Sequence, residues 1–127
     1  MARILILDDV LDAVNLYKRI LEKKGHEVYE FTDEEDALNY VKSNEVDLVI
    51  LDIKLKKMSG VEMLEEIKKI APSVQAIMLT GYPTIETARE SLKLGASEYC
   101  VKPIDKDELE EKVADVLKGQ SVSPFAK

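Results

Sequence analysis

Four short apolar stretches of this chain each lead directly into residues with polar functional groups. The stretches and the residues that follow them are 3–7 with Asp8 and Asp9, 46–51 with Asp52, 76–79 with Thr80, and 99–101 with Lys102. In an open parallel α/β sheet, the carboxyl ends of the strands lie along one edge, and ligands bind there, at the point where strand order reverses. The sequence therefore predicts one site that combines three carboxylates, a hydroxyl and an ammonium, a set suited to phosphate chemistry.

Strand-like and helix-like patterns alternate five times, which predicts an α/β fold with a parallel sheet and helices on both of its faces. Three of the strands read as continuous apolar runs, as expected of strands buried on both sides. The expected strands cover 3–7, 27–31, 47–51, 74–79 and 97–101. The expected helices cover 10–24, 33–44, 61–71, 83–95 and 105–117.

Helical spacing of apolar residues indicates which positions face the interior. In the first helix, we expect Val10, Leu11 and Val14 to belong mostly to the core. In the fourth helix, Pro83 is expected in the first turn, ahead of the apolar positions within 85–92.

Length and composition limit the possible functions. At 127 residues we expect one domain over 1–118 and a flexible tail over 119–127. Cys100 is the only cysteine, which excludes an internal disulfide and fits a reducing compartment. No apolar run has the length of a membrane span, and the net charge of -7 argues against a basic nucleic-acid-binding stripe. We expect a cytoplasmic protein with neither a membrane nor a nucleic acid as a direct partner.

The three acids predict a divalent cation. Asp8, Asp9 and Asp52 cannot all stay ionised in close contact without a positive charge between them. A small number of hard oxygen ligands suits Mg²⁺, which keeps several waters and often bridges to a phosphate. The alternative for the first pair is that one of the two acids caps the helix that follows, and one residue can do both.

Asp52 is the candidate nucleophile because it follows the central apolar strand. A carboxylate beside a metal can attack phosphorus and form an acyl phosphate. Thr80 and Lys102 add a hydroxyl donor and a compact positive charge for the phosphoryl oxygens. Taken alone, each of these two also fits an ordinary strand or turn position, so the functional interpretation depends on their joint placement.

Taken together, these motifs resemble the receiver domain of bacterial two-component response regulators, over roughly residues 3–117. The motifs are Leu7-Asp8-Asp9, Leu51-Asp52 with Gly60 eight residues later, Leu79-Thr80-Gly81-Tyr82, Gly95-Ala96, and Lys102-Pro103. The resemblance implies a flavodoxin-like, doubly wound (βα)5 fold with strand order 2-1-3-4-5. The chain departs from the commonest family pattern in the loop after Asp52, where Leu55 and Lys56 stand in place of Met-Pro.

The resemblance also implies a role for each site residue. Asp52 would be the phosphoacceptor, and Thr80 and Lys102 would bind the phosphoryl group. Mg²⁺ would be held by Asp9 and Asp52 directly, by the backbone carbonyl of Lys54, and by Asp8 largely through water. Thr80 and Tyr99 would form the switch pair, and the bond before Pro103 would be cis.

As a response regulator receiver, the protein would accept phosphate from a histidine kinase or a histidine phosphotransfer protein. It would catalyse only its own phosphorylation and dephosphorylation, and would alter a surface made by helix four, strand five and helix five. The start of helix one and the loop after Lys102 would be the docking surface for the kinase. We expect a monomer, with dimerisation on phosphorylation left open.

Three other functions fit the sequence less well. A haloacid-dehalogenase-type phosphatase needs a second acid two residues after its nucleophile, but that position holds Lys54. An inactive pseudo-receiver usually lacks one of the acids or the lysine, and all are present here. A nucleotide-binding flavodoxin-like protein needs a glycine-rich loop after the first strand, where this chain has 8–11 instead. His26, the only histidine, is expected to be a solvated turn residue.

Two residues beside the predicted site bear on how long a phosphorylated state lasts. Hydrolysis of an aspartyl phosphate needs a positioned water, and neither Lys54 nor Tyr82 is the carboxylate or amide that would position one. Both are long enough to cover the phosphoryl group, which predicts slow self-dephosphorylation. The alternative is that both side chains point into water.

Overall fold

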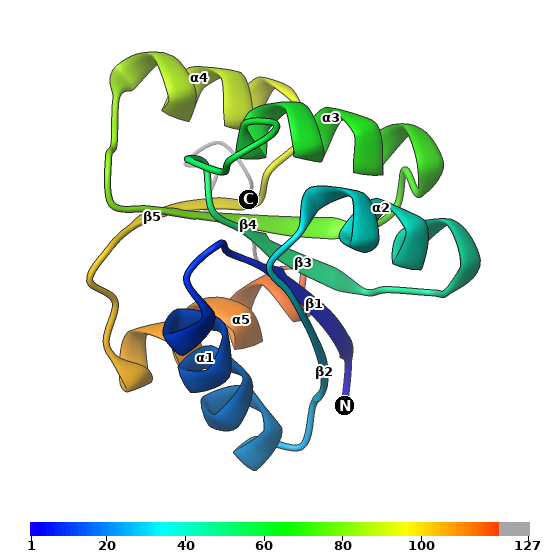
Figure 1. Ribbon diagram of the computed structural model, residues 1–127. Helices are drawn as coiled ribbons and strands as arrows, with labels where there is room; N and C mark the ends of the chain where they lie inside the picture. Colours follow the sequence, from blue (N-terminus) through cyan, green and yellow to red (C-terminus); the bar gives the residue numbers. More distant parts are fainter. Residues whose placement is uncertain (120–127) are drawn as a thin grey trace.

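A computed structural model describes residues 1–119 as one parallel sheet covered by helices on both faces (Figure 1). The sheet has five strands in the order β2-β1-β3-β4-β5, as the resemblance predicts. The strands are β1 (Arg3–Leu7), β2 (Glu27–Phe31), β3 (Leu48–Leu51), β4 (Gln75–Thr80) and β5 (Glu98–Val101). The helices are α1 (Leu11–Lys23), α2 (Glu34–Ser43), α3 (Gly60–Ile70), α4 (Ile85–Lys93) and α5 (Lys106–Leu117).

The predicted elements agree with the observed ones to within a few residues, and the main difference lies at the start of α4. Pro83 precedes the helix rather than occupying its first turn. The helix begins after Thr84, whose side chain accepts a hydrogen bond from the N–H of Thr87. A hydroxyl cap satisfies one of the unpaired N–H groups at a helix start, so the boundary follows the cap rather than the proline.

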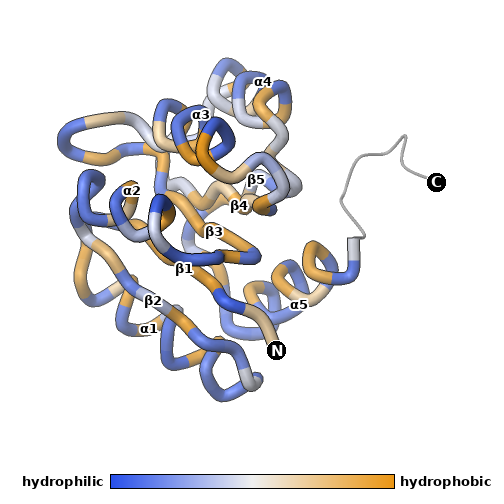
Figure 2. The backbone as a smooth tube through the Cα atoms, turned by 90° about the vertical axis from the view of Figure 1, so that its right-hand side faces the viewer, coloured by the Kyte–Doolittle hydropathy of each residue, from blue (hydrophilic) through white to orange (hydrophobic). Residues whose placement is uncertain are grey.

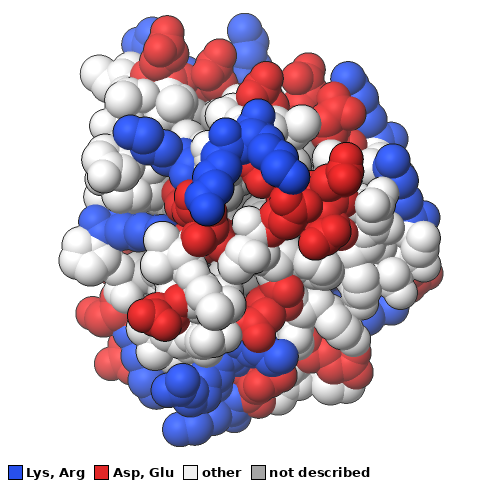
Figure 3. All heavy atoms as spheres, viewed as in Figure 1, with Lys and Arg blue, Asp and Glu red and all other residues white. Residues whose placement is uncertain are grey.

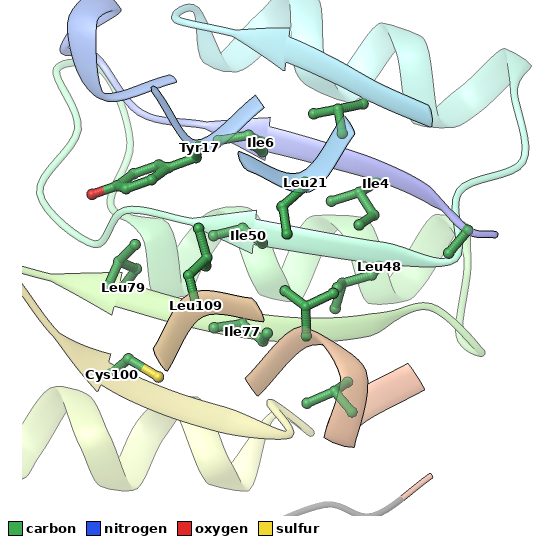
Figure 4. Close-up of a cluster of buried hydrophobic side chains, with 14 of the residues drawn as sticks. Ile4, Ile6, Tyr17, Leu21, Leu48, Ile50, Ile77, Leu79, Cys100 and Leu109 are labelled. Atoms are coloured by element: carbon green, nitrogen blue, oxygen red, sulfur yellow. The ribbon is translucent and has the colours of Figure 1, made fainter. Parts of the chain in front are cut away.

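The sheet separates two layers of apolar core. On one side, α1 and α5 pack on Ile4, Ile6 and Ile50, with Leu109 contributed by α5 (Figure 4). On the other side, α2 and α3 pack on residues of the same strands that point the opposite way, including Leu5 and Leu7 in β1. Figure 2 shows the apolar colour running along the three central strands. Burial on both faces fixes the strands firmly and therefore fixes the edge at which they end.

Helix α4 is much less buried than the other helices. Ser91 is its only buried residue, while Ile85 is 73% and Leu92 is 57% exposed. The large apolar side chains of this helix, Ile85 and Leu92, therefore face outward, and the small polar residue Ser91 is the one that is buried. The helical spacing of apolar residues in a sequence identifies an apolar stripe but does not show what packs on it.

The start of α1 also differs from the prediction. Val10 is 54% exposed and Leu11 is 59% exposed, so neither belongs to the core, whereas Val14 is fully buried. His26 differs from the prediction too: it is half-buried in the turn before β2, and its Nδ1 accepts a hydrogen bond of 3.2 Å from the N–H of Ala2.

Two further expectations concern the C-terminal tail and membrane-spanning helices. Residues 120–127 of the predicted tail lie outside the described residues. Within the described part, no helix combines the length and the apolar character needed to cross a membrane.

Candidate functional site

The residues that follow strands β1, β3 and β5 converge at one edge of the sheet, together with the last residue of β4. Strand β1 lies between β2 and the central strand β3, so Asp8, Asp9 and Asp52 stand where the strand order reverses. One carboxylate oxygen from each of these three acids lies within 4.8 Å of the others. Asp8 and Asp52 are buried, and Asp9 is partly exposed. The structure thus brings together the acids that the sequence predicts would meet.

Lys102 supplies the positive charge between the buried acids. Its Nζ lies 2.6 Å from Oδ2 of Asp8 and 3.5 Å from Oδ2 of Asp52. The lysine follows β5, the strand beside β4, and its peptide bond to Pro103 is cis. Burial alone would lower the pKa of Lys102, but the hydrogen bond to Asp8 and the charges of both acids outweigh it and raise the pKa. The ammonium therefore stays charged.

The pKa of Asp52 is raised above the ordinary value for aspartate. Burial is the main cause, and the charge of Asp8 adds to it, while Lys102 acts in the opposite direction. A carboxylate in this environment is stabilised by added positive charge, because that charge offsets both desolvation and repulsion. The N–H of Lys54 donates to Oδ1 of Asp52 at 3.3 Å and compensates in part.

Asp8 combines the two roles that the sequence left open for the acidic pair. Its Oδ1 accepts a hydrogen bond of 2.9 Å from the N–H of Val10, just before α1, while its Oδ2 contacts Lys102. Asp9 forms no hydrogen bond or ion pair with any other residue in the range 1–119. Its carboxylate is therefore the one most available to a cation. The three carboxylates fit the hard oxygen donors that Mg²⁺ prefers.

Thr80 and Tyr99 connect this edge to α4. Thr80 is fully buried, and its Oγ1 accepts a hydrogen bond of 3.0 Å from the N–H of Tyr82. The hydroxyl of Tyr99 lies 2.7 Å from Oγ1 of Thr87 and accepts a hydrogen bond of 3.3 Å from the N–H of Thr84. The tyrosine is therefore held against the first turn of α4.

Lys54 and Tyr82 meet beside the acids. The Nζ of Lys54 lies 4.3 Å from the centroid of the Tyr82 ring, in a cation–π geometry. Both side chains line a recess of about 350 Å³ that also includes Asp9, Asp52 and Lys102. Both residues are exposed, Tyr82 at 67%, and their side chains contact each other at the rim of the site.

The structure also identifies two contributors that the sequence analysis missed. Thr87 holds the Tyr99 hydroxyl, and the buried carboxylate of Glu34 contacts the loop after β3. Neither position carries a sequence signal, because a threonine or an acid in the first turn of a helix is common for local reasons. Cys100 is buried, which raises the pKa of its thiol to about 11, and it fills the core as expected.

Comparison with known proteins assigns the family. The family model of the response regulator receiver domain matches residues 4–114. The transcriptional regulatory protein ZraR of Klebsiella oxytoca is 35% identical over 114 residues, which are 90% of this chain and 26% of that protein. Sporulation initiation phosphotransferase F of Bacillus subtilis is 33% identical over 115 residues, which are 91% of this chain and 93% of that protein.

Solved structures agree with this assignment. A CheY-like response regulator receiver domain protein from Methanospirillum hungatei JF-1 matches with a TM-score of 0.91 and 37% identity, covering 94% of this chain and 96% of that one. The chain belongs to the response regulator receiver domain family. It spans about a quarter of the length of the ZraR proteins that it matches.

The raised pKa of Asp52 predicts that Asp52→Asn stabilises the protein at pH 7 without Mg²⁺. The folded state binds this proton more tightly than the unfolded chain, so above the folded-state pKa the ionised carboxylate costs stability, and below the ordinary pKa the cost disappears. We expect the melting temperature of the variant to be a few degrees higher at pH 7 and to converge with the parent as the pH falls. Calorimetry measures both, with the exposed Glu111→Gln as control. An unchanged or lower melting temperature for Asp52→Asn at pH 7 would contradict the electrostatic argument.

Proposed function

We propose that Asp52 is the phosphoacceptor of this receiver domain. The observation that carries the proposal is the placement of its carboxylate among Asp8, Asp9 and the Lys102 ammonium at the strand-order reversal. The charge of three acids is only partly balanced by one lysine, so the site favours a cation and then a phosphoryl group that the cation and lysine can bind. Receiver domains of response regulators are signalling switches, and the proposal assigns that activity to particular residues of this chain.

Phosphoryl transfer to Asp52 would be a simple displacement. A carboxylate oxygen of Asp52 forms the new P–O bond while the P–N bond of a donor phosphohistidine breaks, and the bonding electron pair stays on the imidazole nitrogen. Lys102 pairs with the phosphoryl oxygens, and the Thr80 hydroxyl donates a hydrogen bond to them. Because the carboxylate that gains and loses the phosphoryl group belongs to the domain itself, the domain would catalyse only its own phosphorylation and dephosphorylation.

Mg²⁺ would be held by Asp9, Asp52 and the backbone carbonyl of Lys54, with Asp8 contributing largely through water. When bound, it supplies the positive charge that allows a carboxylate and a phosphoryl group to approach each other. The residues of the site hold the reacting groups in position. Asp8 keeps Lys102 in place through their contact of 2.6 Å, and Lys54 orients Asp52 through its N–H.

The output surface would be formed by α4, β5 and α5. Ile85 and Leu92 on α4, and Val101 on β5, are large apolar side chains that are 73%, 57% and 49% exposed. Helix α4 buries little and is held through the hydroxyl of Tyr99, so its position can change at low cost. If Thr80 turns toward a phosphoryl group on Asp52, Tyr99 can move and release the first turn of α4.

The docking surface for a histidine kinase or phosphotransfer protein would include the start of α1. Val10 and Leu11 are exposed apolar residues immediately after the acids, and Val10 also lines the recess above Asp52. An exposed apolar pair next to a reactive group suits a partner that must bring its histidine to that group.

The first test of this function is labelling with a small acyl-phosphate donor and Mg²⁺, followed by mapping of the labelled residue. We expect a single phosphorylated residue, Asp52, with no label in Asp52→Ala or in excess chelator. Asp9→Ala should weaken Mg²⁺ binding by about tenfold or more, because it removes a direct ligand. Stoichiometric labelling of Asp52→Ala at another residue, or equal labelling in chelator, would overturn the assignment.

Another prediction separates phosphorylation of Asp52 from the conformational change at α4 and β5. Thr80→Ala should still be labelled, more slowly than the parent, because Asp52 and Lys102 remain. Phosphorylation-dependent chemical shift changes on α4 and β5 should nevertheless shrink, because a ligand shifts a two-state equilibrium only through contacts that differ between the states. Lys102→Ala should behave similarly, and Thr32→Ala, an exposed threonine, is the control. Shift changes in Thr80→Ala equal to those of the parent would rule out this relay.

The third prediction concerns the lifetime of the phosphorylated state. Because Lys54 and Tyr82 contact each other at the rim of the recess, they can exclude water from a phosphoryl group on Asp52. The double variant Lys54→Asn with Tyr82→Ala should lose label at least several-fold faster than the parent, measured by decay of labelled protein after removal of the donor. Lys56→Asn changes an exposed lysine of the same loop and should decay like the parent. Equal decay of the double variant and the parent would refute shielding.

A further inference from the structure

The loop between β3 and α3, residues 52–59, is anchored by a buried carboxylate from another element. Glu34 is the first residue of α2 and is only 4% exposed. Its Oε2 accepts hydrogen bonds from two successive backbone N–H groups of the loop, those of Lys57 and Met58, the second at 3.0 Å. The carboxylate thus fixes the middle of the loop from a position 23 residues away in the chain.

The two ends of this loop are fixed as well, and both are next to the phosphoacceptor. The loop leaves the sheet at Asp52, and the N–H of Gly60 donates to the carbonyl of Ile53 at 2.7 Å as α3 begins. A Cβ on Gly60 would lie 2.1 Å from the carbonyl oxygen of Asp52, so only glycine permits this approach. Between these ends lies Lys54, whose N–H contacts the Asp52 carboxylate. The Lys54 N–H on Asp52 and the Lys57 N–H on Glu34 therefore belong to the same short segment between the fixed ends.

Burial of Glu34 is compensated by the loop rather than by a cation. Burial alone would raise the pKa of Glu34, but hydrogen bonds from the backbone N–H groups of Lys57, of Glu34 itself and of Met58 together outweigh it, and the pKa lies below its ordinary value. The Nζ of Lys57 pairs with Asp33 at 2.7 Å and not with Glu34. Figure 3 shows basic side chains beside acidic ones at the centre of the face where Figure 1 places this loop. An acceptor oxygen held at this position favours one loop conformation, because any other leaves the two N–H groups and the buried oxygen without partners.

The loop itself lacks a residue that would restrict its backbone. Its sequence from Ile53 to Ser59 contains no proline, and Leu55 and Met58 are only partly buried against the core. We propose that Glu34 is a positioning residue, which holds the loop so that the backbone of Lys54 is presented to the Mg²⁺ and phosphoryl site at Asp52. This proposal rests on the proposed role of Asp52 and adds to it a determinant on the opposite side of the loop.

The test separates the reach of the Glu34 side chain from its charge. Glu34→Asp keeps the charge but withdraws the carboxylate by one methylene, so the two N–H groups lose their acceptor. Glu34→Gln removes the charge but leaves an oxygen in place to accept both hydrogen bonds. Lys57→Ala removes the ion pair with Asp33 and leaves the Lys57 N–H intact, and it serves as the control.

Three quantities are measured for each variant: amide hydrogen exchange at Lys57 and Met58, Mg²⁺ affinity by titration, and the rate of Asp52 labelling at subsaturating Mg²⁺. For Glu34→Asp we expect exchange at the two amides to be about tenfold faster. We also expect Mg²⁺ affinity about tenfold weaker, as for other residues that position metal ligands, with labelling slowed in proportion. Glu34→Gln and Lys57→Ala should stay within about threefold of the parent in all three.

The proposal is overturned if Glu34→Asp exchanges these amides like the parent, or if its Mg²⁺ affinity is unchanged while only its melting temperature falls. It is equally overturned if Glu34→Gln is as impaired as Glu34→Asp, since charge and not reach would then be decisive. Amide exchange and Mg²⁺ affinity do not depend on phosphorylation. A parent that binds Mg²⁺ but accepts no label would therefore contradict the proposed function without affecting the test of Glu34.

Discussion

The contact of Lys102 with the carboxylates of Asp8 and Asp52 is the interaction on which the rest of this site depends. Two buried acids at the end of a parallel sheet repel each other and are desolvated, and a single ammonium 2.6 Å and 3.5 Å away offsets part of that cost. Because this balance is incomplete, the three acids could also hold a divalent cation. Burial of the apolar strands on both faces of the sheet offsets the remaining cost and holds this edge of the sheet in place.

Rigidity and mobility are divided between the two ends of the proposed switch. The acids lie at the ends of strands whose residues are almost fully buried, whereas α4 buries only Ser91 and is attached through the hydroxyl of Tyr99. A weakly buried element can be displaced by a local change that would leave the sheet unaffected. The apolar side chains that α4 exposes give such a displacement a surface on which to act.

The loops around Asp52 are positioned by contacts that differ in kind. On one side, Lys54 and Tyr82 form a cation–π pair that lines the recess. On the other, the Glu34 carboxylate accepts hydrogen bonds from the backbone of the loop. The first contact is exposed and easily altered by substitution, while the second is buried and costly to break. The proposed lifetime and the proposed metal affinity of the site are therefore set by different residues.

The strands, their order of appearance and the convergence of the three acids with Thr80 and Lys102 were predictable from the sequence, because apolar runs and the residues that end them are local patterns. The resemblance to receiver domains supplied the strand order. The outward face of α4, the exposure of Val10 and Leu11 and the partner of His26 were not predictable, since a periodic pattern marks an apolar stripe without showing what packs on it. Glu34 is the clearest case. The two N–H groups that donate to its carboxylate are 23 and 24 residues away in the chain, and only the tertiary structure brings them together.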